Sequence, residues 1–147
     1  WSMEDGDRHS VLANVNDDAP GASVTAACIS PDGSLVALGD DSGAVGLYEL
    51  GVGTTPLLTV NPAVDSGADS PVACIRYSPT RYWMACAVGA HVVVYNLETK
   101  GVLICTSWHD GGEKRSKTDV TSLAFTAGGT TFVAVHADGA TVRVQYE

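Results

Sequence analysis

The sequence predicts an all-β fold, a β-propeller of repeated four-stranded blades. The first indication is a fixed period, because the valines that begin three similar phrases recur 48 residues apart: Val24, Val72 and Val120. The serine or threonine that opens the turn within each phrase keeps the same spacing. The second indication is composition, since short runs rich in valine, alanine and aromatic residues between glycine-rich or Ser-Pro turns are typical of a propeller blade rather than of a helical repeat.

Each period contains four expected strands in a fixed order. The first is an outer strand, expected at 10–15, 56–60 and 102–107. The second is expected at 24–29, 72–77 and 120–125. A turn follows, which in the first period contains Asp32-Gly33, a pair suited to a tight reversal. The third and fourth strands are expected at 35–38, 83–87 and 132–135, and at 45–50, 92–97 and 141–146.

These strands divide the chain into about three blades of a ring that commonly has about four to eight. The expected units are 9–50, 51–100 and 101–147, with 1–8 as the end of a preceding blade. The chain begins with Trp1 and ends just after the strand expected at 141–146. Counted without the outer strand at 102–107, this is the third strand of the last blade, which therefore lacks its outer closing strand. We expect this chain to be the C-terminal part of a larger ring. Repeats of this kind bury their faces against neighbouring repeats, so the remaining blades of the ring are expected partners.

Composition limits the classes of partner. The chain has 147 residues, 45% of them hydrophobic, and a net charge of −9, which argues against holding nucleic acid by bulk electrostatics. No signal peptide, apolar run of membrane-spanning length or glycosylation sequon is present in the sequence. We expect a cytoplasmic protein with no membrane contact.

No motif indicates catalysis, a cofactor or a metal site. The four cysteines lie within expected strands without a Cys-x-x-Cys spacing: Cys28, Cys74, Cys86 and Cys105. Buried reduced thiols are the preferred interpretation, with zinc ligation or disulfides as alternatives. The four histidines occupy unrelated positions of the repeat and are expected at the surface or in turns: His9, His91, His109 and His136.

Paired acidic residues and a glycine-rich stretch are expected to be ordinary turns. Asp40-Asp41 and Asp17-Asp18 lack a companion in a defined geometry, so we interpret them as solvated turn residues. The stretch 39–43 leads into another strand and not into a helix, which excludes a phosphate-binding loop.

The strands that close the first two blades carry a recognisable phrase. Tyr48-Glu49-Leu50 and Tyr95-Asn96-Leu97 resemble the WD40 repeat, in which a Trp-Asp pair ends the third strand of a blade. Tyrosine replaces the tryptophan in both phrases, and Gln145-Tyr146 takes that place in the last copy. The Gly-His pair of many WD40 repeats is absent from the sequence, so the repeats are degenerate.

The middle blade resembles one family in particular. Residues 78–84 (SPTRYWM) and 94–100 (VYNLETK) are similar to the penultimate blade of the receptor for activated protein kinase C, also described as guanine nucleotide-binding protein β-subunit-like. This resemblance implies a seven-bladed, non-enzymatic scaffold on the head of the small (40S) ribosomal subunit that recruits protein kinase C-type signalling proteins. The family contacts ribosomal RNA mainly through early blades that this chain lacks, so no RNA-binding residue is assigned here.

Two groups of residues are candidates for binding a partner. Arg81 and Tyr82 are expected to project from the turn between the first two strands of a blade, whereas Trp83 is expected to pack against the neighbouring blade. The second group is the basic cluster Lys114, Arg115 and Lys117, which is either a solvated loop or a contact to phosphates or an acidic partner.

Two other functions remain open. The chain could be a WD40 scaffold subunit of another cytoplasmic or nuclear complex, which the sequence upstream of this chain would distinguish. An enzyme with a site in the central channel is the third hypothesis, and no residue pattern supports it.

Overall fold

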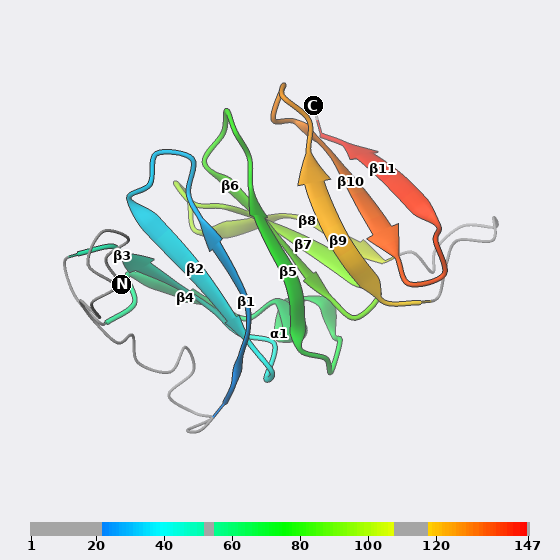
Figure 1. Ribbon diagram of the computed structural model, residues 1–147, viewed down its shortest axis with the longest axis horizontal. Helices are drawn as coiled ribbons and strands as arrows, with labels where there is room; N and C mark the ends of the chain where they lie inside the picture. Colours follow the sequence, from blue (N-terminus) through cyan, green and yellow to red (C-terminus); the bar gives the residue numbers. More distant parts are fainter. Residues whose placement is uncertain (1–21, 52–54, 108–117, 147) are drawn as a thin grey trace, which may run out of the picture.

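The computed structural model describes residues 22–51, 55–107 and 118–146, which form three antiparallel sheets and one short helix (Figure 1). The first sheet contains β1 (Val24–Ile29), β2 (Leu35–Asp40), β3 (Val45–Glu49) and β4 (Leu58–Val60). The second contains β5 (Val72–Tyr77), β6 (Trp83–Val88), β7 (His91–Asn96) and β8 (Gly101–Ser107). The third contains β9 (Val120–Phe125), β10 (Thr131–His136) and β11 (Thr141–Gln145).

The strand pattern confirms the all-β prediction. Each described strand lies within two residues of its expected position, and the expected outer strand at 10–15 falls outside the described residues. Within each sheet, consecutive strands are hydrogen-bonded neighbours. The expected outer strands at 56–60 and 102–107 therefore complete the sheet of the strands that precede them, as β4 and β8.

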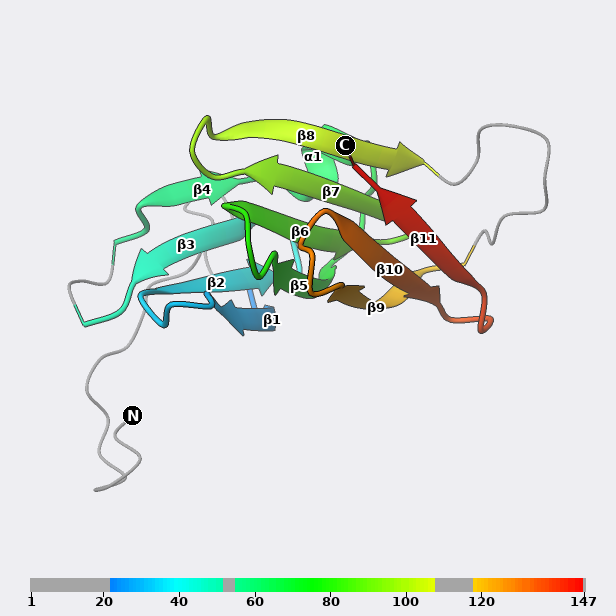
Figure 2. The same ribbon diagram turned by 90° about the horizontal axis from the view of Figure 1, so that it is seen from above.

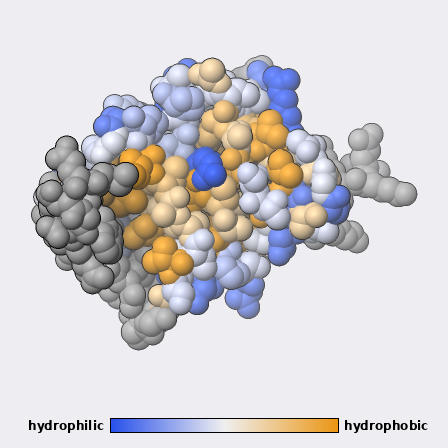
Figure 3. All heavy atoms as spheres, viewed as in Figure 1, coloured by the Kyte–Doolittle hydropathy of each residue, from blue (hydrophilic) through white to orange (hydrophobic). Residues whose placement is uncertain are grey.

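The three sheets fan out side by side as blades, with β1, β5 and β9 along their common inner edge (Figures 1 and 2). They do not close into a ring, so the described residues form part of a propeller. On the side viewed in Figure 3, apolar residues gather over these inner strands. Val24 and Ile29, at the two ends of β1, are both more than half exposed.

Two apolar cores separate the sheets, and the second sheet supplies both. Because successive side chains of a strand point to opposite faces, Met84 and Cys86 of β6 face the first sheet whereas Ala85 and Ala87 face the third. The alternation of β7 follows the same rule, with Val93 and Tyr95 in the first core and Val92 and Val94 in the second. This continuous burial explains why β6 and β7 have almost no polar residues.

A one-turn helix, α1 (Pro62–Ser66), lies between β4 and β5, where the sequence analysis expected no helix or strand. Asn61 caps its start by accepting a hydrogen bond from the Val64 amide at 3.2 Å, and proline is favoured at the first helical position. Gly67 ends the helix in the left-handed conformation, with φ of 72°. The helix packs on the second sheet, where the Tyr95 hydroxyl donates a hydrogen bond to Asp65.

Two polar residues predicted at the surface are buried. Asp40 ends β2 and His136 ends β10, and each is only 1% exposed. Asp40 Oδ1 accepts hydrogen bonds from the Ser42 amide at 2.9 Å, the Ser42 hydroxyl at 2.6 Å and the Ala44 amide at 3.2 Å. The prediction was wrong because a turn that follows a central strand folds back over its last side chain. Asp17 and Asp18, with His9 and His109, lie outside the described residues.

The cysteines differ in burial. Cys74 and Cys86 are buried as predicted, Cys28 is partly buried and Cys105 is exposed, contrary to the expectation of burial. All four are free thiols. Cys105 lies on β8, the outermost strand of its sheet, and outer strands have one face and one edge open. Within the described residues, α1 is the single helix and is far too short to cross a bilayer.

Candidate partner-binding site

Arg81 and Tyr82 lie in the turn between β5 and β6, as predicted. Ser78 organises this turn: its amide donates to the Trp83 carbonyl at 2.9 Å, and its hydroxyl oxygen accepts from the Arg81 amide at 3.2 Å. The carbonyl of Tyr82 accepts a hydrogen bond from the Leu97 amide at 2.7 Å, which links the turn to the end of β7. The backbone is therefore held while the side chain of Tyr82 stays 69% exposed.

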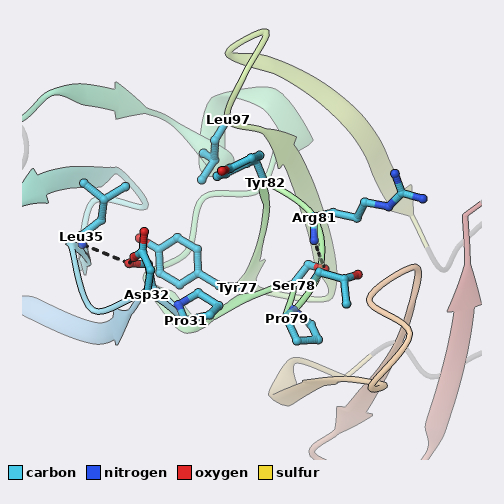
Figure 4. A pocket seen from close by; sticks show the side chains of 11 residues that line it. Pro31, Asp32, Leu35, Tyr77, Ser78, Pro79, Arg81, Tyr82 and Leu97 are labelled. Atoms are coloured by element: carbon cyan, nitrogen blue, oxygen red, sulfur yellow. Dashed lines mark hydrogen bonds between the residues drawn. The ribbon is translucent and has the colours of Figure 1, made fainter.

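Trp83 packs against the neighbouring blade, which confirms the prediction. Its ring lies edge to face with Tyr146 of the third sheet, at a centroid distance of 5.4 Å and an interplanar angle of 86°. The guanidinium carbon of Arg81 lies 5.9 Å from the centroid of the Trp83 ring, within the range of a cation–π interaction. Arg81 therefore leans toward the third sheet, away from Tyr82 (Figure 4).

A groove of about 260 Å³ lies between the turn of the first sheet and the equivalent turn of the second (Figure 4). We call it the inter-turn groove. Its walls are residues 30–32 and 77–82, and its remaining lining comes from Leu35 and Leu97. The 48-residue period brings the two Ser-Pro dipeptides, Ser30-Pro31 and Ser78-Pro79, to opposite sides of this groove.

The corresponding space between the second and third sheets is bridged by hydrogen bonds. The Ser78 hydroxyl donates to the Gly129 carbonyl at 2.8 Å, and the Thr80 hydroxyl donates to the Gly128 carbonyl at 2.9 Å. We call these two bonds the inter-turn clasp. They bring the second turn directly against the third.

The first turn makes no such clasp because its polar groups bond to one another. The Ser30 hydroxyl donates to Asp32 Oδ1 at 2.6 Å, and the same oxygen accepts from the amide and hydroxyl of Ser34 at 3.0 and 2.7 Å. Asp32 stands at the repeat position that Thr80 occupies in the second turn. In the second turn Thr80 donates to the neighbouring turn, whereas in the first turn Asp32 accepts hydrogen bonds within its own turn. No clasp forms there, and the inter-turn groove is open.

The groove contains one permanent negative charge. The hydrogen bond from the Ser30 hydroxyl, followed by those from Ser34, lowers the pKa of Asp32 to about 2. Asp32 is therefore ionised at neutral pH, and its side chain is exposed. Burial raises the pKa of Tyr77, so this hydroxyl stays neutral beneath the groove. The Tyr77 oxygen is buried and has no hydrogen-bond partner among the described residues.

Exposed apolar side chains lie at the same end of the sheets as the groove. Five exposed hydrophobic residues lie at the strand ends and turns on this side: Ile29, Leu50, Leu57, Tyr82 and Val102. Tyr82 both lines the groove and is exposed, and aromatic residues are enriched at protein-binding surfaces. The site is thus suited to binding a polypeptide.

The other predicted site residues, Lys114, Arg115 and Lys117, lie outside the described residues. Over the part of the chain that is described, no group of three or more metal-binding side chains comes together. The sequence analysis did not identify Asp32 or Leu97 as site residues. The signal that could have identified Asp32 is the repeat itself, which aligns it with Thr80 beside Arg81 and Tyr82.

Comparison with known proteins identifies relatives that share the same name. No protein-family model matches the chain. "Small ribosomal subunit protein RACK1" of Neurospora crassa is 30% identical over 117 residues, which cover 78% of this chain and 35% of the relative. The protein of that name from Trypanosoma brucei brucei is 30% identical over 115 residues, 78% of this chain and 34% of the relative.

A plant relative is somewhat more similar. "Small ribosomal subunit protein RACK1y" of Oryza sativa subsp. japonica is 35% identical over 121 residues, which cover 82% of this chain and 34% of the relative. The chain thus spans about a third of the length of the curated relatives that it matches. With the repeated antiparallel sheets, these matches show that the chain is a RACK1-like WD40-repeat protein.

Proposed function

We propose that this chain is part of a non-catalytic scaffold protein of the cytoplasm that associates with the small (40S) ribosomal subunit and links signalling proteins to translation. The observation that carries the proposal is the shared name of its relatives, since the matches from a fungus, a trypanosome and a plant are each called a small ribosomal subunit protein. The resemblance of residues 78–84 to the receptor for activated protein kinase C supports the signalling role.

The described structure suits such a role physically. Hydrogen-bonded sheets with two shared cores form a rigid body, and rigid bodies present their turns in constant positions. The inter-turn groove and several exposed apolar side chains lie at one end of this body. A partner can therefore bind there without a change in the fold.

The proposed partners fall into three groups. Other blades of the same ring cover the exposed apolar residues of β1. Small-subunit proteins and ribosomal RNA bind mainly through blades upstream of this chain. Protein kinase C-type signalling proteins bind the exposed turns.

We propose 9–50, 51–100 and 101–147 as the repeat units, with 1–8 ending a preceding blade. In this division the first strand of each unit completes the sheet of the unit before it, consistent with the pairing of β4 and β8.

Sedimentation of the intact protein tests the proposal. A lysate is separated on a sucrose gradient at moderate salt, and fractions are probed for this chain. We expect co-migration with small subunits and polysomes that weakens as the salt concentration rises, because contacts to RNA phosphates release counterions. Migration in a lighter complex, or at the top of the gradient, would contradict ribosome association and favour a WD40 scaffold of another assembly.

A charge variant tests the basic cluster within the same experiment. Replacing Lys114, Arg115 and Lys117 with alanine is expected to reduce co-sedimentation if the cluster contacts phosphates. The matched control replaces three exposed basic residues of the described sheets and loops with alanine: Arg76, Lys100 and Arg143. Equal co-sedimentation of both variants and the unchanged protein would assign the cluster to solvent and leave ribosome association intact.

A further inference from the structure

The inter-turn groove has an unbalanced charge. The Oδ1 atom of Asp32 accepts three hydrogen bonds within its own turn. Its Oδ2 atom makes no hydrogen bond among the described residues, so one oxygen of an ionised carboxylate remains available at the wall of the groove. A cation brought to this oxygen would need no rearrangement of the turn.

Arg81, the basic residue among those that line the groove, does not neutralise this charge. Arg81 contributes to the lining of the groove, yet its guanidinium group points toward the third sheet and stacks over Trp83 (Figure 4). The second turn therefore lines the groove without placing a positive charge in it. The net charge of −9 of the whole chain adds to the attraction for a positively charged ligand.

Part of the remaining lining is apolar and suits the stem of a long side chain. Tyr82 stands beside the opening with 69% of its surface exposed, and Leu97 and Leu35 complete the lining (Figure 4). The volume of about 260 Å³ lies below the about 300–1,000 Å³ of pockets for drug-sized ligands. The groove is therefore of a size for one side chain rather than for a small-molecule cofactor.

We propose that the inter-turn groove binds an arginine side chain from an extended segment of a partner protein. The guanidinium group donates to the free oxygen of Asp32 and its flat face lies on the Tyr82 ring, and the aliphatic stem lies along Leu97. Arginine fits better than lysine because one planar group can donate a hydrogen bond at its edge and stack on an aromatic ring with its face. This inference is independent of ribosome association, since it depends only on the groove.

The first test is a peptide titration of the intact protein, followed by nuclear magnetic resonance. The probe is a nine-residue peptide of glycine and serine with one central arginine, and the matched peptides carry glutamine or leucine there. We expect the arginine peptide to shift resonances of residues 30–34 and 77–82, and to bind about fivefold more tightly than either matched peptide, the upper range for an exposed ion pair. Equal binding of the leucine peptide would make this a general apolar groove and overturn the proposal.

Variants separate the groove from the overall charge. Asp32→Asn keeps the shape of the turn residue and is expected to weaken arginine-peptide binding about fivefold. The matched control is Asp138→Asn, which makes the same change of charge at an exposed residue that likewise accepts a backbone hydrogen bond in its own turn. Equal weakening by both variants would show a non-specific charge effect and overturn the proposal.

A second variant keeps the test decisive if Asp32→Asn disturbs the turn. Tyr82→Ala removes an exposed side chain whose ring makes no ring contact among the described residues. We expect about threefold weaker binding of the arginine peptide, in line with an exposed cation–π contact. Unchanged affinity in this variant, or shifts confined to residues outside the groove, would refute the site.

Discussion

Individual polar side chains determine how the turns and connections of this molecule are held. Asp40 is buried, yet Oδ1 accepts three hydrogen bonds from its own turn, which offsets part of the cost of removing the carboxylate from water. Tyr95 is also buried, and its hydroxyl reaches out of the second sheet to Asp65 on α1. Single hydrogen bonds of this kind tie irregular segments to the sheets.

The bond between Tyr95 and Asp65 gives a prediction for stability. Tyr95→Phe is expected to lower the free energy of unfolding by about 1.5–3 kcal/mol, as for a hydrogen bond to a charged group. Urea denaturation of the intact protein measures this change. Tyr82→Phe is the control, because this exposed hydroxyl has no hydrogen-bond partner among the described residues and its loss should change stability little. Equal stability of the two variants would contradict the role given to Tyr95.

The same bond has a predictable dependence on pH. Burial, followed by the hydrogen bond to Asp65, raises the pKa of Tyr95 above its ordinary value of 10.0. A group whose pKa is raised by folding stabilises the protein fully below its unfolded pKa and loses that effect as the pH rises. The stability difference between the unchanged protein and Tyr95→Phe should therefore shrink above about pH 10. A difference that grows there would contradict the assignment.

At the scale of the elements, the turn between the first and second strands of each blade decides how closely neighbouring sheets meet. The second turn donates two side-chain hydrogen bonds to backbone carbonyls of the third turn, whereas the first turn bonds within itself. Gly33 and Gly129 occupy the same repeat position in the first and third turns, each with φ of 75°. Gly33 has open space around it, but Gly129 lies directly beneath the clasp.

Alanine variants of these two glycines measure how much the inter-turn clasp contributes to the free energy of unfolding. A Cβ atom at Gly129 would collide with Thr80 Oγ1 and lie 2.6 Å from Ser78 Oγ, whereas one at Gly33 would meet nothing within 4 Å. Both alanine variants carry the backbone strain of a positive φ, about 1 kcal/mol or more. We expect Gly129→Ala to be less stable than Gly33→Ala by a further 1–3 kcal/mol or so, as for overpacking. Urea denaturation compares them, and equal losses would show that the clasp contributes nothing.

The strands were predictable from the sequence because they depend on local pattern and on a strict period. The helix α1 was missed although its signals, Asn61-Pro62 and Gly67, are present, because one turn of helix has too few residues for an apolar periodicity. The burial of Asp40 and the opening of the inter-turn groove were not predictable. Both depend on which of two possible partners a hydroxyl or carboxylate bonds to. This is determined by the residues packed around it in the folded protein and not by the spacing of residues in the sequence.

For the molecule as a whole, the second sheet is the shared element. Its β6 and β7 strands place alternate side chains in the core toward the first sheet and in the core toward the third. Each of the other two sheets meets a single described neighbour. Blades in such an arrangement stabilise one another through their common faces. We therefore expect the two cores to lose their structure together.

Cysteine labelling measures this coupling, since Cys86 lies in the core toward the first sheet and Cys74 in the core toward the third. Alkylation requires an accessible thiolate, and burial raises the pKa of Cys86. In the native protein we expect iodoacetamide to modify the exposed Cys105 first. Burial and the charge of Asp65 raise the pKa of this thiol too, so its modification should become faster as the pH rises.

Mass spectrometry along a urea series should then show Cys74 and Cys86 losing protection at the same urea concentration. Earlier modification of Cys74 would mean that the third sheet detaches by itself, because Cys74 belongs to the core that this sheet covers.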